Sequence, residues 1–182
     1  IAGASLLLDR YGAAVNHLER DGFTVDAKVY CVLEGENLTT MAKTTGLALL
    51  ELPTVLDKIK PDIVVTIADR YETIATAISA AYMNIPLAHL QGGEVTGTID
   101  DKVRHAVTKL ADVHFTATDK ARDNIIRMGE SPLKVFKTGC PSIDLAAKVI
   151  ANPGFPVDPF AKFGGVGNLF NLEEGYIVVM QH

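Results

Sequence analysis

The sequence has few cysteines and no long apolar run. Cys31 and Cys140 are far apart and form no CxxC pair, so neither a disulfide framework nor a zinc site is supported. No apolar run reaches the roughly 18 residues of a membrane-spanning helix, and no basic and apolar leader is present. These features predict that the protein works in the reducing cytoplasm and has no membrane partner.

An excess of positive charge is also lacking. The formal net charge is −5, and the lysines and arginines are scattered and form no basic stripe, so no nucleic-acid partner is expected. The 182 residues are enough for one domain with a real core. Because the sequence starts at Ile1 without a methionine and stops at the end of a strand-like run, we expect further sequence beyond both ends.

Short β-branched runs alternate with longer helical patterns over residues 1–150. This alternation is typical of βα units around a parallel sheet. The expected strands are 27–33, 62–68, 86–90, 112–118, 134–139 and 176–181. The expected helices are 11–20, 38–60 with a break at Pro53, 71–83, 100–111, 119–128 and 143–150. The pattern predicts an α/β fold with an open, doubly wound parallel sheet.

Residues 151–175 differ in composition from the rest. Three prolines and a glycine cluster interrupt any periodicity, which predicts a linker or mobile loop and not a phosphate-binding loop. Residues 176–182 would then open a second domain, and residues 1–150 would form the first.

Polar residues follow several expected strands, where ligands gather in open parallel sheets. Asp69 comes directly after the strand at 62–68, with Arg70 beside it. Its carboxylate could cap the next helix, could act as a base, or could do both.

A glycine pair follows the strand at 86–90. Gly92 and Gly93 allow a tight turn, and they would also let a ligand approach the backbone closely. Glu94, the next residue, could be a base or a solvated loop carboxylate.

The helix expected at 100–111 has a polar face rich in titratable groups. Thr98 and Asp101 have the spacing of a capping box, and Asp100 adds to an acidic first turn. Asp100 shares a face with Arg104, and Asp101 shares one with His105. This face could be solvated, or it could belong to a site.

The remaining candidates have simpler explanations. His89 and His114, each within an apolar strand, are expected to be hydrogen-bonded core residues. Ser142 could be a helix N-cap or a phosphate or sugar contact. Cys140 has no evident activating partner, and no spacing of ligand residues predicts a metal.

Taken together, the segments "ADRYE", "AHLQGGEVTGTIDDKVRHAVTKLADVHF" and "TGCPSID" resemble the UDP-N-acetylglucosamine 2-epimerase family. Their order and spacing are most similar to its hydrolysing branch, from sialic-acid and related nonulosonic-acid pathways. The resemblance covers nearly the whole chain. It implies a GT-B-type architecture of two facing Rossmann-like domains, of which this chain would be most of the N-terminal one, without its first strand.

The resemblance also implies a reaction. The family eliminates UDP from the sugar to give a 2-acetamidoglucal, and water then adds to yield N-acetylmannosamine and free UDP. It implies a UDP-sugar substrate, a homodimer, and neither cofactor nor metal. A related substrate would be UDP-N,N'-diacetylbacillosamine of the legionaminic acid pathway. A non-hydrolysing epimerase, a glycosyltransferase and a nucleotide-sugar binding module are the alternatives.

Carried over by position, the family's acid and base residues fall on four positions. They are Asp69, Gln91, Asp100 and, at the family's second-domain histidine, His182. Substrate-binding or supporting roles would fall on Arg70, Gly92, Gly93, Arg104, His105 and Ser142.

Gln91 departs from the family, which often has a glutamate at that position. An amide cannot usefully exchange a proton at neutral pH. Three explanations remain open: a subgroup that acts on a different sugar, with Glu94 taking over the proton work; an engineered replacement; or a lower activity. We favour the subgroup, because Glu94 lies three residues away on a glycine turn.

Overall fold

The structure is a computed structural model that describes residues 1–35, 37–67, 70–154, 157–168 and 170–179. The chain divides into two compact units, Ile1–Cys140 and Pro141–His182. No helix among the described residues has the length and apolar character needed to cross a membrane.

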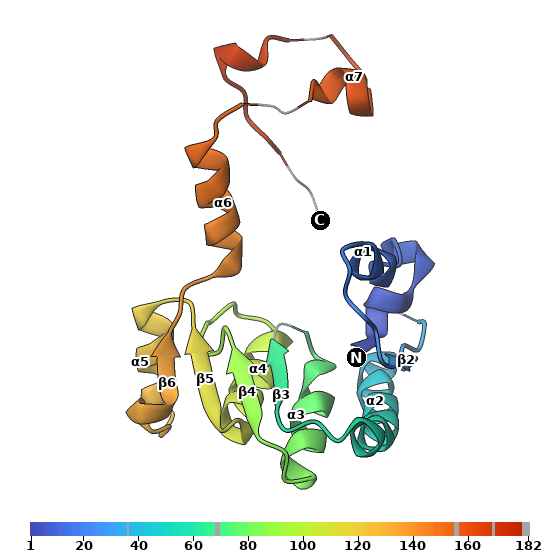
Figure 1. The fold of residues 1–182 in the computed structure, drawn as a ribbon, viewed down its shortest axis with the longest axis vertical. Helices are drawn as coiled ribbons and strands as arrows, with labels where there is room; N and C mark the ends of the chain where they lie inside the picture. Colours follow the sequence, from blue (N-terminus) through green and yellow to red (C-terminus); the bar gives the residue numbers. More distant parts are fainter. Residues whose placement is uncertain (36, 68–69, 155–156, 169, 180–182) are drawn as a thin grey trace. The chain divides into compact units, whose positions relative to one another are not determined.

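The first unit is built on parallel strands (Figure 1). Four of them form one sheet in the order β3 (Val64–Ile67), β4 (Leu87–Leu90), β5 (Val113–Thr116) and β6 (Val135–Lys137). A smaller sheet pairs β1 (Ala2–Gly3) with β2 (Lys28–Val29), also in parallel. Each of these strands except β1 falls inside a predicted run, because short β-branched runs buried on a sheet form strands.

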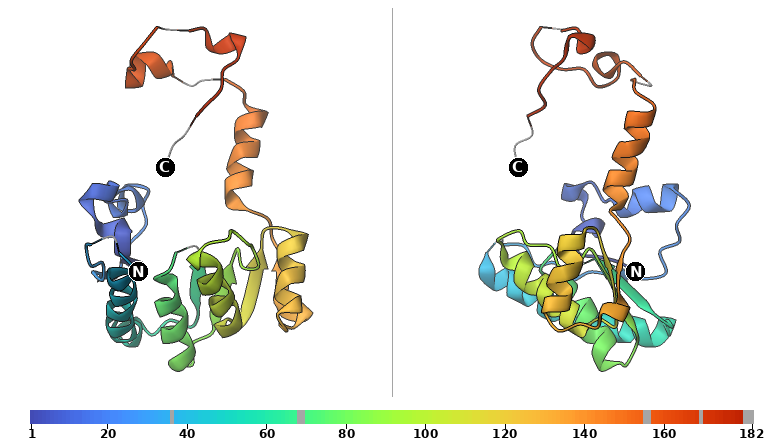
Figure 2. Two further views of the ribbon diagram at one scale, coloured as in Figure 1. Left: turned by 180° about the vertical axis from the view of Figure 1, so that it is seen from behind. Right: turned by 90° about the vertical axis from the view of Figure 1, so that its left-hand side faces the viewer.

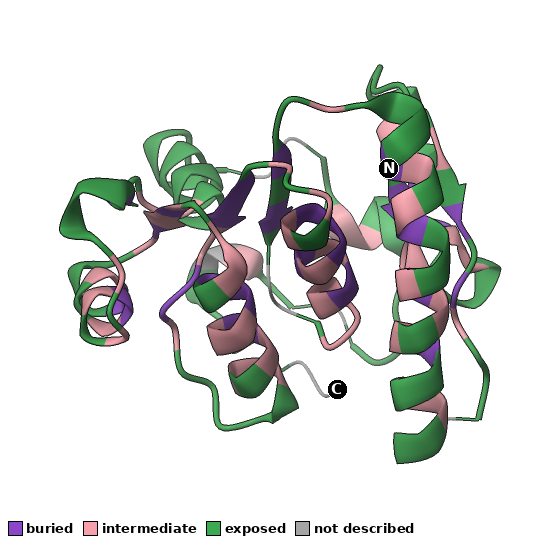
Figure 3. Cartoon of the chain, turned by 90° about the horizontal axis from the view of Figure 1, so that it is seen from below, coloured by how far each residue is buried: buried purple, intermediate pink, exposed green. Residues whose placement is uncertain are grey.

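Helices connect the strands. They are α1 (Val15–Arg20), α2 (Leu38–Ile59), α3 (Thr73–Tyr82), α4 (Ile99–Leu110) and α5 (Asp119–Arg127). Short 3-10 turns span Ala4–Leu7, Asp9–Tyr11 and Pro132–Lys134. Helices α3, α4 and α5 lie on one face of the four-stranded sheet (Figures 2 and 3). The prediction of a Rossmann-like α/β fold is thereby confirmed.

The predicted break at Pro53 is wrong, because α2 runs through it without interruption. A proline inside a helix removes one backbone hydrogen bond. Ala48 and Leu52 before it and Leu56 after it are all buried along one helix face. Burial of this continuous apolar face offsets the loss of the hydrogen bond.

The core lies between the helices and the strands. One cluster joins Leu56 of α2 with Val64, Leu87 and Val107, which come from β3, β4 and α4. Helix α3 passes through the middle of it and buries small residues, among them Ala77 and Ala80. This packing brings the carboxyl ends of β3 to β6 to one edge of the sheet, where the polar candidates follow.

The second unit contains helix α6 (Pro141–Ala151), in which every residue is exposed. Helix α7 (Pro159–Phe163) and a 3-10 turn at Leu172–Glu174 follow within the predicted linker. Residues 176–179 have no regular secondary structure, and residues 180–182 lie outside the described part. The strand expected at 176–181 and the boundaries of a second domain stay predictions.

Candidate functional site

The candidate site is the turn that leaves β4 and enters α4. Gln91 adopts a left-handed conformation, with φ of 57°, directly after β4, and its N–H donates to Phe115 O at 2.7 Å. Asp69 and His182 lie outside the described residues, so their roles stay predictions.

The two glycines allow this turn to pack tightly on its neighbours. A Cβ on Gly92 would lie 2.8 Å from Nδ1 and Cε1 of His89. A Cβ on Gly93 would lie 2.1 Å from the carbonyl oxygen of Ala121, and the φ of Gly93 is 81°. Both residues are buried, so close packing on β4 and α5 by itself requires glycine at these positions.

Side chains from two helices hold the carbonyl groups of the turn. Asn124 Nδ2 of α5 donates to Gly93 O at 2.8 Å, and Arg104 Nη1 of α4 donates to Glu94 O at 3.1 Å. Asn124 is not among the site residues predicted from the sequence. The contact joins residues 31 positions apart, and no local pattern around an asparagine in mid-helix indicates such a partner.

Asp101 holds the loop between the turn and the helix. Its carboxylate accepts from Thr96 N at 2.7 Å, Gly97 N at 2.7 Å and Thr96 Oγ1 at 2.8 Å. The two backbone N–H groups, then the Thr96 hydroxyl and Arg104, lower the pKa of Asp101 to about 2. Asp101 is therefore a charged structural anchor and a poor candidate for proton transfer.

The predicted capping box is only half formed. Thr98 is the N-cap of α4, and its Oγ1 accepts from Asp100 N at 3.2 Å. Asp101, however, reaches back past the N-cap to Thr96 and Gly97. Asp100 Oδ2 accepts from Thr98 Oγ1 at 3.1 Å.

The polar face of α4 is only partly solvated. Arg104 is 2% exposed and pairs at 3.0 Å with Asp101, three residues before it, and not in the expected i,i+4 arrangement with Asp100. Asp100, Asp101 and His105 are each partly buried. His105 Nδ1 is buried without a hydrogen-bond partner among the described residues. The face is therefore buried at Arg104 and partly exposed at the other three residues, and its membership of a site stays a prediction.

Gln91 makes a structural contact. Its Nε2 donates to Cys140 Sγ at 3.6 Å, at the end of the first unit. Ser142 is the second residue of α6, not its N-cap, so that part of the prediction is wrong. Its relation to a sugar or phosphate stays a prediction.

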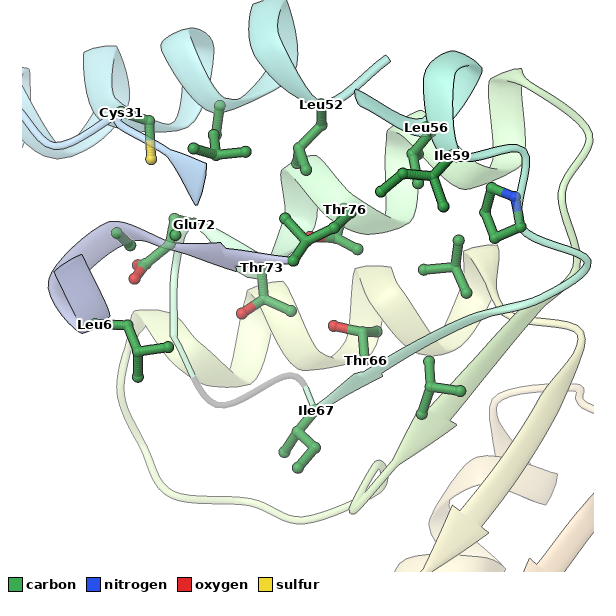
Figure 4. A pocket seen from close by; sticks show the side chains of 18 of the residues that line it. Leu6, Cys31, Leu52, Leu56, Ile59, Thr66, Ile67, Glu72, Thr73 and Thr76 are labelled. Atoms are coloured by element: carbon green, nitrogen blue, oxygen red, sulfur yellow. The ribbon is translucent and has the colours of Figure 1, made fainter. Parts of the chain in front are cut away.

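Arg70 and Glu72 follow β3. Arg70 is exposed, and its Nε donates to Glu72 Oε1 at 2.6 Å. Glu72 Oε2 is buried without a hydrogen-bond partner among the described residues. This carboxylate lines a cavity of about 700 Å³ between β1 and β3 (Figure 4). Apolar side chains such as Leu52, Leu56 and Ile67 form most of its wall. Gln91, Glu94 and Asp100 do not line it.

His89 and His114 are core residues, as predicted, but the predicted hydrogen bonding is found only for His89. Both ring nitrogens of His114 are buried without a hydrogen-bond partner among the described residues, and its Nε2 lies 3.7 Å from Glu130 Oε2. The two histidines are neighbours in register on β4 and β5, and both are 0% exposed. His89 Nδ1 lies 3.2 Å from Thr108 Oγ1 of α4. Burial, followed by repulsion from His114 and Arg104, lowers the pKa of His89 to about 3. His89 is thus a neutral support beneath Gly92.

These features define a class: a Rossmann-like α/β domain with a glycine turn and carboxylates at the carboxyl edge of its parallel sheet. The model of the UDP-N-acetylglucosamine 2-epimerase family matches residues 2–182, and the chain belongs to this family.

Named relatives extend the comparison. The chain is 40% identical over 134 residues to a UDP-N,N'-diacetylbacillosamine 2-epimerase (hydrolyzing) of Legionella pneumophila, covering 74% of this chain and 36% of the relative. It is 32% identical over 156 residues to a GDP/UDP-N,N'-diacetylbacillosamine 2-epimerase (hydrolyzing) of Campylobacter jejuni. That match covers 85% of this chain and 39% of the relative. The chain thus spans less than two fifths of the length of the first relative.

A solved structure supports the fold. The UDP-GlcNAc 2-epimerase of Neisseria meningitidis, bound to UDP-GlcNAc, superposes with a TM-score of 0.66 at 22% identity, over 78% of this chain and 38% of that one.

Proposed function

We propose that the protein containing this chain is a hydrolysing 2-epimerase of a UDP-linked 2-acetamido sugar. The observation that carries the proposal is the Gly92–Gly93–Glu94 turn, which leads into the acidic first turn of α4 within a chain of this family. The names of the Legionella and Campylobacter relatives support the hydrolysing reaction and favour UDP-N,N'-diacetylbacillosamine. UDP-N-acetylglucosamine, with N-acetylmannosamine as product, is the other candidate substrate.

The proposed reaction has two steps. A base removes the proton from C2 of the sugar while the bond from C1 to the diphosphate oxygen breaks, so that UDP leaves and a 2-acetamidoglucal forms. Water then adds across the double bond: its oxygen goes to C1, and a proton reaches C2 from the opposite face. Both steps need carboxylates placed at the sugar, because the C2 proton is weakly acidic and C1 develops positive charge.

The roles follow from the partners of each side chain. We propose Asp69 for proton removal at C2, and Glu94 with Asp100 for the protonation or for the water. Asp101 is excluded from these roles because its carboxylate already accepts four hydrogen bonds, from Thr96, Gly97 and Arg104. The amide of Gln91 contributes no proton and anchors on Cys140. Arg70 is an exposed cation that would meet the departing diphosphate.

A further strand belongs to this proposal. The cavity between β1 and β3 is apolar, and Val65 and Ile67 of β3 are 58% and 51% exposed. A parallel strand from outside residues 1–182 would join the two sheets and bring a donor to Glu72 Oε2. The apolar cavity therefore supports the expected first strand of a two-domain protein.

We also propose that this protein is a homodimer in the cytoplasm.

The test uses the full-length protein in deuterated buffer, with UDP-N-acetylglucosamine and UDP-N,N'-diacetylbacillosamine in separate reactions. NMR follows the release of UDP and the deuterium at C2. Release of stoichiometric UDP with a deuterated 2-epimer is expected for one sugar. Epimerisation that leaves UDP attached would identify a non-hydrolysing enzyme, and no change in either sugar would contradict the proposal.

A further inference from the structure

We infer that Asn124 of α5 is a positioning residue for Glu94. The inference rests on the proposed function, in which Glu94 handles a proton or the water. Asn124 lies on a different helix from every residue with a proposed role in the chemistry, and within the described part of the chain its side chain makes one hydrogen bond, to Gly93 O at 2.8 Å.

This contact is held on both sides. The Cα of Gly93 approaches the Ala121 carbonyl so closely that a Cβ would meet it at 2.1 Å, which leaves the turn no room to move toward α5. Helix α5 is fixed at its start, where Thr118 Oγ1 accepts from Ala121 N at 3.1 Å. The Asn124 amide therefore projects from a rigid element onto a turn that is already packed.

The hydrogen bond controls the backbone of Glu94. In a planar trans peptide, the carbonyl and the following N–H point in opposite directions. When Asn124 holds Gly93 O toward α5, the Glu94 N–H must point away from α5. On the other side of the residue, Arg104 holds Glu94 O from α4. The two peptide planes that flank the Glu94 Cα are thus fixed by two helices, and together they set the direction of its Cα–Cβ bond, from which the side chain extends.

Asn124 can be changed with less disturbance than Arg104. Arg104 is buried and also pairs with Asp101, so its removal would disturb the whole entry to α4. Asn124→Asp keeps the shape and replaces the donating NH2 by an oxygen. An ionised carboxylate faces the Gly93 carbonyl with no proton to donate, whereas the protonated acid restores an O–H donor.

The experiment measures UDP release by the full-length protein, in wild type, Asn124→Asp and Asn124→Ala. Lys120→Gln is the control, because Lys120 is an exposed residue of α5 and its replacement lowers the net charge by the same amount as Asn124→Asp. At pH 8 we expect kcat of Asn124→Asp to fall about tenfold to a hundredfold with KM nearly unchanged. The control should match wild type.

The pH profile separates positioning from a general structural role. The kcat of Asn124→Asp divided by the kcat of wild type should rise severalfold between pH 8 and pH 5.5, as the introduced carboxyl gains a proton. The ratio for Asn124→Ala should stay low and flat. Glu94, Asp100 and His105, the ionisable groups of the turn and of α4, are present in wild type and in both variants, so the comparison between Asn124→Asp and Asn124→Ala isolates the introduced carboxyl.

The outcomes are distinct. A kcat within twofold of wild type for either variant, or a loss confined to KM, would overturn the inference while the proposed function stands. A flat pH ratio for a folded Asn124→Asp would overturn it as well. If Asn124→Asp does not fold, Asn124→Ala provides the test: a lower kcat with KM nearly unchanged supports the inference, and a kcat within twofold of wild type or a loss confined to KM overturns it. No UDP from wild type with either sugar would overturn the proposed function, and the inference with it.

Discussion

Helices α4 and α6 begin with similar sequence signals and have different surroundings. Both follow a strand of the sheet after a short turn with a hydroxyl residue and an early aspartate. In α4 the residues Arg104, Val107 and Thr108 are buried, and the helix entry is held by hydrogen bonds to the turn after β4. In α6 every residue is exposed. A start signal therefore predicts a helix, and tertiary contacts decide whether that helix can hold a site rigidly.

The largest effect is expected for the buried charge of α4. Arg104→Met should lower the free energy of unfolding by about 4 kcal/mol, because it breaks a buried ion pair and leaves Glu94 O without this donor. Lys148→Met in α6, where the side chain is exposed, should change it by less than about 0.5 kcal/mol. Urea unfolding followed by circular dichroism measures both. Equal losses of unfolding free energy in Arg104→Met and Lys148→Met would show that the buried contacts of α4 do not make it more stable than α6.

The turns that lead into the two helices provide the second test. Gly93→Ala should destabilise by about 3 kcal/mol, since the new Cβ meets the Ala121 carbonyl in a left-handed conformation. Gly139 precedes α6 with φ of 89° and has nothing within 4 Å of an added Cβ. Gly139→Ala should therefore cost only about 1 kcal/mol. A similar cost at both positions would show that the conformation alone, and not packing on α5, requires glycine.

The third prediction concerns pH. The folded-state pKa of His89 is about 3, below its ordinary value of 6.5, so the unfolded chain binds this proton more tightly. The stability contribution is complete above about pH 6.5 and is lost as the pH falls toward 3. Between pH 7 and pH 5 the loss from His89 should be about 2 kcal/mol. Burial also lowers the pKa of His114, which adds a loss of the same sign.

Unfolding measurements of His89→Gln at both pH values check this. The variant should be less stable than wild type but should lose about 2 kcal/mol less on acidification. His17→Gln, at an exposed position of α1, should follow wild type. If His89→Gln keeps the wild-type pH dependence, protonation of His89 is not what destabilises the acid form.

The smallest effect is expected at the helix starts themselves. Thr98→Ala removes the N-cap of α4 and should cost about 1 kcal/mol. Ser142→Ala should change stability by less than about 0.5 kcal/mol, because Ser142 lies inside α6 and caps nothing in the described part of the chain. Urea unfolding of Thr98→Ala and Ser142→Ala measures both losses of stability. An equal loss in the two variants would indicate that Ser142 caps α6.

The sequence predicted the order of strands β2 to β6 and of the helices between them, since apolar β-branched runs and capped helical patterns are local signals. It missed β1, and residues 176–179 have no regular structure. It also identified the Gly92–Gly93 turn and the acidic entry to α4. It did not predict the burial of Arg104 or the continuity of α2 at Pro53, because both depend on packing with other elements. The role of Asn124 could not be predicted for the same reason: its partner lies on another element, 31 positions earlier.

We propose that Glu94, held between α4 and α5, takes part in the chemistry. The most direct measurement is UDP release in the full-length protein with Glu94→Gln, beside Glu51→Gln on the exposed side of α2. If Glu94 transfers a proton, Glu94→Gln should lose about a hundredfold or more in kcat with substrate still bound, and Glu51→Gln should lose nothing. A wild-type rate for Glu94→Gln would contradict this proposal.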